Sequence, residues 1–99
     1  MDVTYRTNQL KRACTDFGVA QREYGLEMAE KIHQRIGEIK GIELVELLVQ
    51  FNVGRCHPLT GDMKGLYAMD LVQPHRLIFE KHQTRVRCVR ITKIEVDYH

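Results

Sequence analysis

The apolar residues of the chain change their spacing near Gly54. Before this glycine they recur at intervals of three and four residues, which is the repeat of a helix with one buried face. After it they tend to alternate with polar residues, as in a strand, and turn-forming residues interrupt them. Helices followed by successive short strands predict an α+β domain, with two to three N-terminal helices packed on one face of a small antiparallel sheet.

The expected helices all precede Gly54. The first spans Thr7 to Phe17, with Thr7 as its N-cap and Gly18 as its end. The second has an apolar stripe and ends at Gly41; the stripe consists of Tyr24, Met28, Ile32, Ile36 and Ile39. A third, shorter helix is indicated by Leu44, Leu47, Leu48 and Phe51. The stripes of these helices need a common partner, which the strands supply.

The expected strands span residues 66–72, 76–80 and 86–98, and residues 53–59 are a candidate for one more. Strict alternation on the last strand divides its side chains between two faces. One face would carry Ile91, Lys93, Glu95, Asp97 and His99, and the other Thr92, Ile94, Val96 and Tyr98. On the middle strand, Arg76 lies on the side opposite Leu77 and Phe79. We therefore expect a cationic centre on the open face of the sheet.

The length and the charge balance limit the classes of protein to consider. Ninety-nine residues predict a single domain over residues 1–99. Residues 1–53 carry seven Lys or Arg and eight Asp or Glu (net −1), whereas residues 54–99 carry eight and five (net +3). An anionic partner is therefore expected at the C-terminal half, although ordinary solvated surface charge reaches the same balance.

No apolar run approaches the roughly 20 residues that span a bilayer, and the N-terminus lacks the apolar core of a signal peptide. Cys14, Cys56 and Cys88 form neither an even set nor a CxxC pair. These features predict a protein of the reducing cytoplasm that does not bind membranes.

Three separate segments can bring titratable side chains to the open sheet face: the loop of residues 57–65, the strand start at Arg76, and the terminal Asp97-Tyr98-His99. Two imidazoles, a carboxylate, a phenol and a guanidinium suit acid-base chemistry on a phosphodiester without a metal. Each residue alone has an inert interpretation: His57 as a surface residue, Arg76 as an edge-strand charge, Tyr98 as a core residue. We interpret His33 and His82 as inert.

Other kinds of site fit the sequence less well. The spacing of Cys56, His57, Cys88 and His99 does not match a zinc site. Cys56 and His57 are adjacent, so in a strand they point to opposite faces, which disfavours a cysteine nucleophile. Gly61 and Gly65 lack the GK[ST] ending of a phosphate-binding loop and are typical of turns.

The ordered motifs resemble the HigB-like toxins of the RelE/ParE superfamily, which belong to bacterial toxin-antitoxin systems. The resemblance rests on His57-Pro58-Leu59 with Gly61-Asp62 and Gly65, on Arg76-Leu77-Ile78-Phe79, and on Asp97-Tyr98-His99. It implies a toxin that cleaves translated mRNA in the ribosomal A site without a metal or another cofactor.

The resemblance implies a catalytic set of His57, Arg76, Asp97, Tyr98 and His99. We expect His99 or Asp97 to act as base, His57 as acid, Arg76 to stabilise charge, and Tyr98 to hydrogen-bond or stack on a base. The candidate substrate contacts are Arg55, Thr60 and Lys64. Thr60 stands where some relatives have a lysine after His-Pro-Leu, and Lys64 is the nearest cation.

The partners that the resemblance implies are a helix-turn-helix antitoxin, the ribosome and mRNA, with operator DNA contacted only through the antitoxin. Two alternatives remain open. One is a ParE-like toxin that inhibits gyrase. The other is a module that binds RNA or protein without catalysis.

Overall fold

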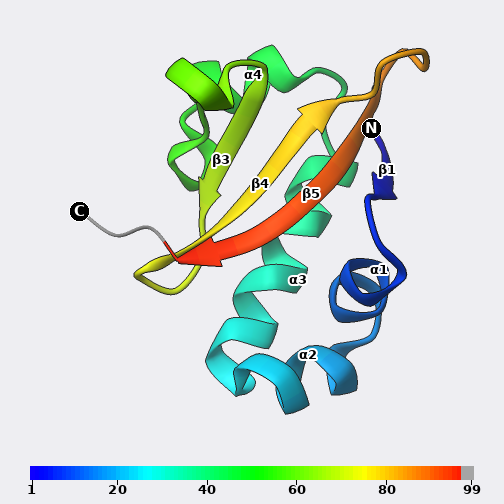
Figure 1. The fold of residues 1–99 in the computed structure, drawn as a ribbon, viewed down its shortest axis with the longest axis vertical. Helices are drawn as coiled ribbons and strands as arrows, with labels where there is room; N and C mark the ends of the chain where they lie inside the picture. Colours follow the sequence, from blue (N-terminus) through cyan, green and yellow to red (C-terminus); the bar gives the residue numbers. More distant parts are fainter. Residues whose placement is uncertain (97–99) are drawn as a thin grey trace.

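The computed structural model describes residues 1–96 as an α+β fold, in which helices lie behind one face of a sheet (Figure 1). The strands within this range are β1 (Asp2–Tyr5), β2 (His57–Pro58), β3 (Leu66–Asp70), β4 (His75–Lys81) and β5 (Cys88–Val96). Their order across the sheet is β1-β5-β4-β3-β2. The predicted fold class is confirmed.

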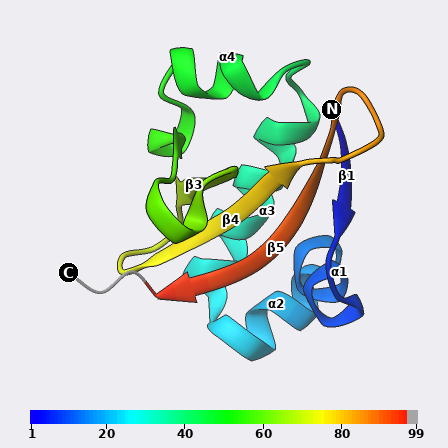
Figure 2. The same cartoon turned by 45° about the horizontal axis from the view of Figure 1, so that its top comes forward.

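The described helices are α1 (Asn8–Thr15), α2 (Phe17–Tyr24), α3 (Leu26–Lys40) and α4 (Val45–Gln50), with 3-10 turns η1 (Val53–Arg55) and η2 (Gly61–Met63). The long α3 runs behind β4 and β5 in both views (Figures 1 and 2). Its Ile32, Ile36 and Ile39 are buried in one core cluster with Leu77, Phe79 and Ile91 of the sheet. In residues 1–96, no helix combines the length and apolar character needed to cross a bilayer.

The start of the first helix and the end of the long one are where the sequence predicted them. Thr7 caps α1, because its hydroxyl accepts a hydrogen bond from the Leu10 amide at 3.1 Å, and Gly41 follows the last residue of α3. Gly18, however, does not end the first helix. Asp16 accepts hydrogen bonds from the amides of Gly18 and Val19, at 3.0 and 3.3 Å, and thereby starts the separate helix α2.

The sheet differs from the prediction at both edges. It is mixed rather than wholly antiparallel, because β1 pairs in parallel with β5. The four residues of β1 are too few to give a clear alternation in the sequence. At the other edge, only His57 and Pro58 of residues 53–59 form a strand. Asn52, Gly54 and Arg55 have φ angles of 54°, 56° and 53°, and these left-handed conformations turn the chain instead of extending it.

A bulge in β5 decides which side chains face the helices. Ile78 pairs with Lys93 while Phe79 pairs with Ile91, so Thr92 is an extra residue without a partner on β4. The extra residue shifts the alternation by one position. Ile91 therefore lies in the core, and Lys93 lies on the opposite side, which we call the outer face. The prediction that Ile91 shares a face with Lys93 and Glu95 was wrong, because strict alternation assumes no bulge.

Candidate functional site

The outer face carries two neighbouring rows of paired residues. The first row runs across β2, β3, β4 and β5 and consists of His57, Ala68, Ile78 and Lys93. The second lies two residues further along the strands and consists of Asp70, Arg76 and Glu95. Directly paired residues project from the same face of a sheet. The fold therefore brings His57 and Arg76, which are distant in the sequence, to one face.

The ring of His57 is exposed and is oriented by the backbone of the preceding turn. Its Nδ1 atom lies 2.8 Å from the carbonyl oxygen of Arg55. A carbonyl oxygen only accepts hydrogen bonds, so Nδ1 carries the proton and donates it to this oxygen. The other ring nitrogen, Nε2, is then the atom that can accept a proton when the ring is neutral, or donate one when the ring is protonated.

Arg55 occupies a left-handed conformation, with φ of 53°, which costs a residue with a Cβ about 1–2 kcal/mol. The Arg55 side chain is 72% exposed and forms a salt bridge with Asp70. The Nε atom of Arg55 lies 2.9 Å from a carboxylate oxygen of Asp70, whose side chain is 21% exposed. Asp70 therefore contacts the same residue whose carbonyl group orients His57.

Arg76 and Glu95 form a half-buried ion pair on the outer face. The guanidinium donates to Glu95 Oε2 from Nε at 3.2 Å and from Nη2 at 2.9 Å, and the two side chains are 15% and 20% exposed. The Lys93 ammonium lies 3.1 Å from the other carboxylate oxygen. Partial burial acts to raise the pKa of Glu95, but the contacts with Lys93 and Arg76 outweigh it and lower that pKa. Glu95 is thus held ionised beside the guanidinium.

The other candidate residues lie around this face or beyond the described range. Thr60 and Lys64 flank η2 in the connection between β2 and β3, and both are exposed. Asp97, Tyr98 and His99 lie outside the described residues. Their sequence follows β5, whose last residue, Val96, pairs with His75 beside Arg76.

The site includes acidic partners that the sequence analysis did not identify, Asp70 and Glu95. A signal for Asp70 was available, because the tight connection at Gln73-Pro74 predicts a hairpin in which Asp70 and Arg76 are equidistant from residue 73. A buried arginine, Arg35, was also missed. It falls on the apolar stripe of α3 between Ile32 and Ile36, where a charge is unexpected.

The thiol next to His57 is not available for nucleophilic chemistry. Cys56 is 2% exposed, and burial raises the pKa of its thiol to about 12, which keeps the thiol protonated at neutral pH. Within residues 1–96, no cluster of three or more His, Cys, Asp or Glu side chains is placed to hold a metal ion.

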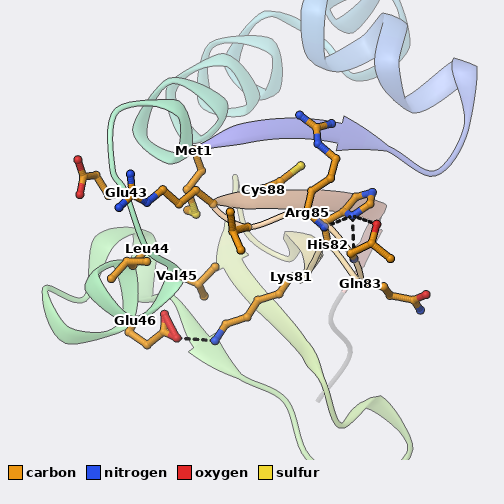
Figure 3. Close-up of a pocket in the computed structure, with 13 residues that line it drawn as sticks. Met1, Glu43, Leu44, Val45, Glu46, Lys81, His82, Gln83, Arg85 and Cys88 are labelled. Carbon is orange, nitrogen blue, oxygen red and sulfur yellow. Dashed lines mark hydrogen bonds and ion pairs between the residues drawn. The ribbon is translucent and has the colours of Figure 1, made fainter.

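Figure 3 shows the side chains that line one cavity of the structure. The cavity has a volume of about 640 Å³ and lies between α4 and the turn that joins β4 to β5. Glu46 and Lys81, which both line this cavity, form an ion pair. Lys81 and Arg76 are at opposite ends of β4, so this cavity does not include the rows around Arg76.

Comparisons with solved structures match the fold over almost the whole chain. A YoeB/ParE toxin from Agrobacterium tumefaciens matches 99% of this chain and 100% of its own length, with a TM-score of 0.67 and 18% identity. A YoeB dimer from Staphylococcus aureus matches 99% and 98%, with a TM-score of 0.64 and 16% identity. The chain has the fold of the YoeB/ParE toxins.

A YoeB-YefM complex from Staphylococcus aureus gives the same TM-score of 0.64 at 15% identity, over 99% of this chain and 98% of the other. No protein-family model matches the sequence, and no curated protein matches it. The likeness to the YoeB/ParE toxins is therefore one of fold, and the finer HigB-like assignment rests on the sequence motifs.

Proposed function

We propose that the chain is the toxin of a type II toxin-antitoxin system, a HigB-like endoribonuclease that cleaves translated mRNA in the ribosomal A site without a metal. The observation that carries this proposal is the placement of His57 and Arg76 on one face, in adjacent rows. Two strand spacings of about 4.8 Å and one step of roughly 6.8 Å separate their backbones. A phosphodiester placed over β3 would lie between the two side chains.

The proposed reaction is an attack of the ribose 2′-oxygen on the adjacent phosphorus. A base, His99 or Asp97, takes the 2′-hydroxyl proton as the new P–O bond forms. The bond to the 5′-oxygen breaks, and the protonated ring of His57 gives its Nε2 proton to that oxygen. Arg76 stabilises the charge on the phosphoryl oxygens. The products are a 2′,3′-cyclic phosphate and a 5′-hydroxyl, so atoms and protons balance.

The hydrogen bond to the Arg55 carbonyl supports the acid assignment of His57. It stabilises the proton on Nδ1 in the imidazolium form and directs Nε2 away from the turn. Arg55, Thr60 and Lys64 are the proposed contacts to neighbouring phosphates, and Tyr98 is the proposed group that hydrogen-bonds or stacks on a base.

The proposed partner is a helix-turn-helix antitoxin that blocks the toxin and carries the contact with operator DNA. One of the solved structures with this fold is a heterotetrameric YoeB-YefM toxin-antitoxin complex. The proposed place of action is the cytoplasm, where translating ribosomes supply the substrate.

Primer extension on transcripts after brief induction tests the proposed function. We expect in-frame cuts inside translated codons with the wild-type chain. His99→Ala and His57→Ala should each lower cleavage by about 10²–10⁴-fold, the usual contribution of a proton-transfer group. His82→Asn is the matched control, because His82 lies in the β4–β5 turn and an asparagine keeps an acceptor for the amides of Thr84 and Arg85.

Other outcomes would favour other functions. Undiminished toxicity of His99→Ala, with supercoiling defects and no mRNA cuts, would favour a ParE-like gyrase inhibitor. Absence of cleavage by the wild type, with RNA affinity that falls steeply in salt, would favour a binding module.

A further inference from the structure

Arg35 places a charged group among the buried residues of α3. The residue is 9% exposed, and its neighbours on the same helix, Ile32 and Ile36, belong to the core. Its Nε donates to the backbone oxygen of Asp70 at 2.7 Å, and its Nη1 donates to Glu38 Oε1 at 2.7 Å. A buried charge is costly unless it is paired and hydrogen-bonded, and both conditions are met here.

The guanidinium also supports the η1 turn directly. A Cβ atom built on Gly54 would lie 2.6 Å from Nε, 2.8 Å from Cζ and 3.0 Å from Cδ of Arg35. The turn therefore lies against the arginine at a distance that only glycine permits, and its φ of 56° also favours glycine. Arg35 thus holds the end of β3 and η1 in one fixed arrangement.

Two further contacts connect this arrangement to the candidate site. Asp70, whose backbone oxygen binds Arg35, uses its carboxylate to hold Arg55 at 2.9 Å. Arg55 in turn presents its carbonyl oxygen to Nδ1 of His57. Of the three contacts in this series, the first and last are hydrogen bonds and the middle one is an ion pair, so a displacement of Asp70 or of the turn would move the acceptor that orients the ring.

We propose that Arg35 is a positioning residue: it fixes the η1 turn against Asp70 so that the Arg55 carbonyl holds the His57 ring with its proton on Nδ1. Arg35 reaches no substrate from its place behind the sheet and acts only through Asp70 and Gly54. The expected effect of Arg35 on RNA cleavage rests on the proposed function. Its expected effect on the proton position in the His57 ring does not.

The direct test is ¹⁵N NMR of the histidine rings in the full chain, at a pH where the ring of His57 is neutral. The wild type should show His57 with the proton on Nδ1. Arg35→Met fills the same space without a donor and should shift His57 toward the mixed tautomers of an unrestrained imidazole. Glu38→Gln is the matched control: it removes the ion pair of Arg35 but leaves the bond to Asp70, so His57 should keep the wild-type signature.

Cleavage kinetics supply a second readout. We expect Arg35→Met to lower kcat roughly a hundredfold, as misplacement of a reacting group by about 1 Å does, with a smaller change in KM. Arg35→Lys, which keeps a donor within reach of the Asp70 oxygen, should restore part of the loss. If the chain proves not to cleave RNA, the proposed function fails, and the NMR signature still decides the positioning proposal.

A variant that retains every charge covers the case in which Arg35→Met does not fold. Gly54→Ala pushes the turn away from the guanidinium and should give the same change in the His57 tautomer. The proposal is overturned if a folded Arg35→Met or Gly54→Ala variant keeps the wild-type ring signature, or if Glu38→Gln changes it as much.

Discussion

Gly54 has a left-handed backbone conformation and also lies close to Arg35. Both features predict that a side chain at this position would destabilise the fold. Gly54→Ala should lower the free energy of unfolding by more than the roughly 1–2 kcal/mol that a left-handed residue with a Cβ costs, because the new methyl group would also overlap Arg35. Chemical denaturation of the purified chain measures the loss.

Gly61→Ala is the control for the backbone contribution alone. Gly61 has a φ of 66°, but a Cβ built there meets no atom within 4 Å. Equal losses for the two alanine variants would show that the contact with Arg35 contributes nothing to stability.

The lowered pKa of Glu95 predicts that the stability of the fold depends on pH. Its folded-state pKa lies below the ordinary value of 4.5, despite the opposing effect of burial, because Lys93 and Arg76 contact the carboxylate. The folded state therefore releases this proton more readily than the unfolded state. The resulting stabilisation is present above about pH 4.5 and is lost as the pH falls through the folded-state pKa.

Urea unfolding at a series of pH values tests this expectation. Glu95→Gln should be less stable at neutral pH, since Arg76 loses a charged partner, and should show a smaller further loss in acid than the wild type. Glu30→Gln, at an exposed position of α3, is the control. An acid response of Glu95→Gln as large as that of the wild type would contradict the assignment.

At the scale of elements, the bulge in β5 determines which side chains reach the outer face. Deletion of Thr92 would leave Phe79 opposite Ile91 and Ile78 opposite Lys93 in an ordinary antiparallel register. We expect this deletion to fold and to keep the Arg76–Glu95 pair. Its cost should be about 1–3 kcal/mol, which includes the hydrogen bond from the Thr92 hydroxyl to the Ile78 oxygen at 3.2 Å.

Deletion of Ile94 is the matched comparison in the same strand. It would keep the bulge and place Glu95 opposite Leu77, toward the core, so it should destabilise the chain far more than the deletion of Thr92. Thermal unfolding of both variants measures the difference. Similar midpoints would mean that the bulge does not set the faces of β5.

The elements also show why sequence predicted some features and missed others. The spacing of Met28, Ile32, Ile36 and Ile39 was enough to predict α3, because one helical face buries those residues. Tyr24, which the predicted stripe also included, ends the separate helix α2 before Gly25. Alternation around Leu77 and Phe79 was enough to place Arg76 on the outer face. The bulge at Thr92 was not predictable in this way, because one extra residue leaves no mark on local composition.

The buried contacts behind the candidate site were harder to predict from the sequence than the residues exposed on it. His57 and Arg76 carry recognisable chemistry in a loop motif and a strand motif. The contact of Arg35 with Asp70 joins residues that are 35 positions apart, and it depends on how α3 lies relative to the end of β3. No local pattern encodes that packing, although a charge on an apolar stripe is a signal that can be sought in other chains.

At the scale of the whole molecule, the charge is divided between the two halves of the sequence. Residues 54–99, whose described part includes β2 to β5, carry eight cations and five acidic residues, whereas the helical half is nearly neutral. Several of these cations, including Arg76 and Lys93, project from the outer face. The proposed RNA partner should therefore meet the sheet rather than the helices, and each phosphate contact should add to the salt dependence of binding.

Lys64 tests this expectation, because it is an exposed cation of the β2–β3 connection and the proposed substitute for the lysine that Thr60 replaces. Lys64→Gln should weaken binding to ribosomes and reduce the slope of log affinity against log salt by about 1, the value for one lost phosphate contact. Lys11→Gln, which removes another exposed cation from α1, should leave the slope unchanged. If the two variants reduce the slope equally, the attraction is a property of the total charge, and the outer face has no special part in binding RNA.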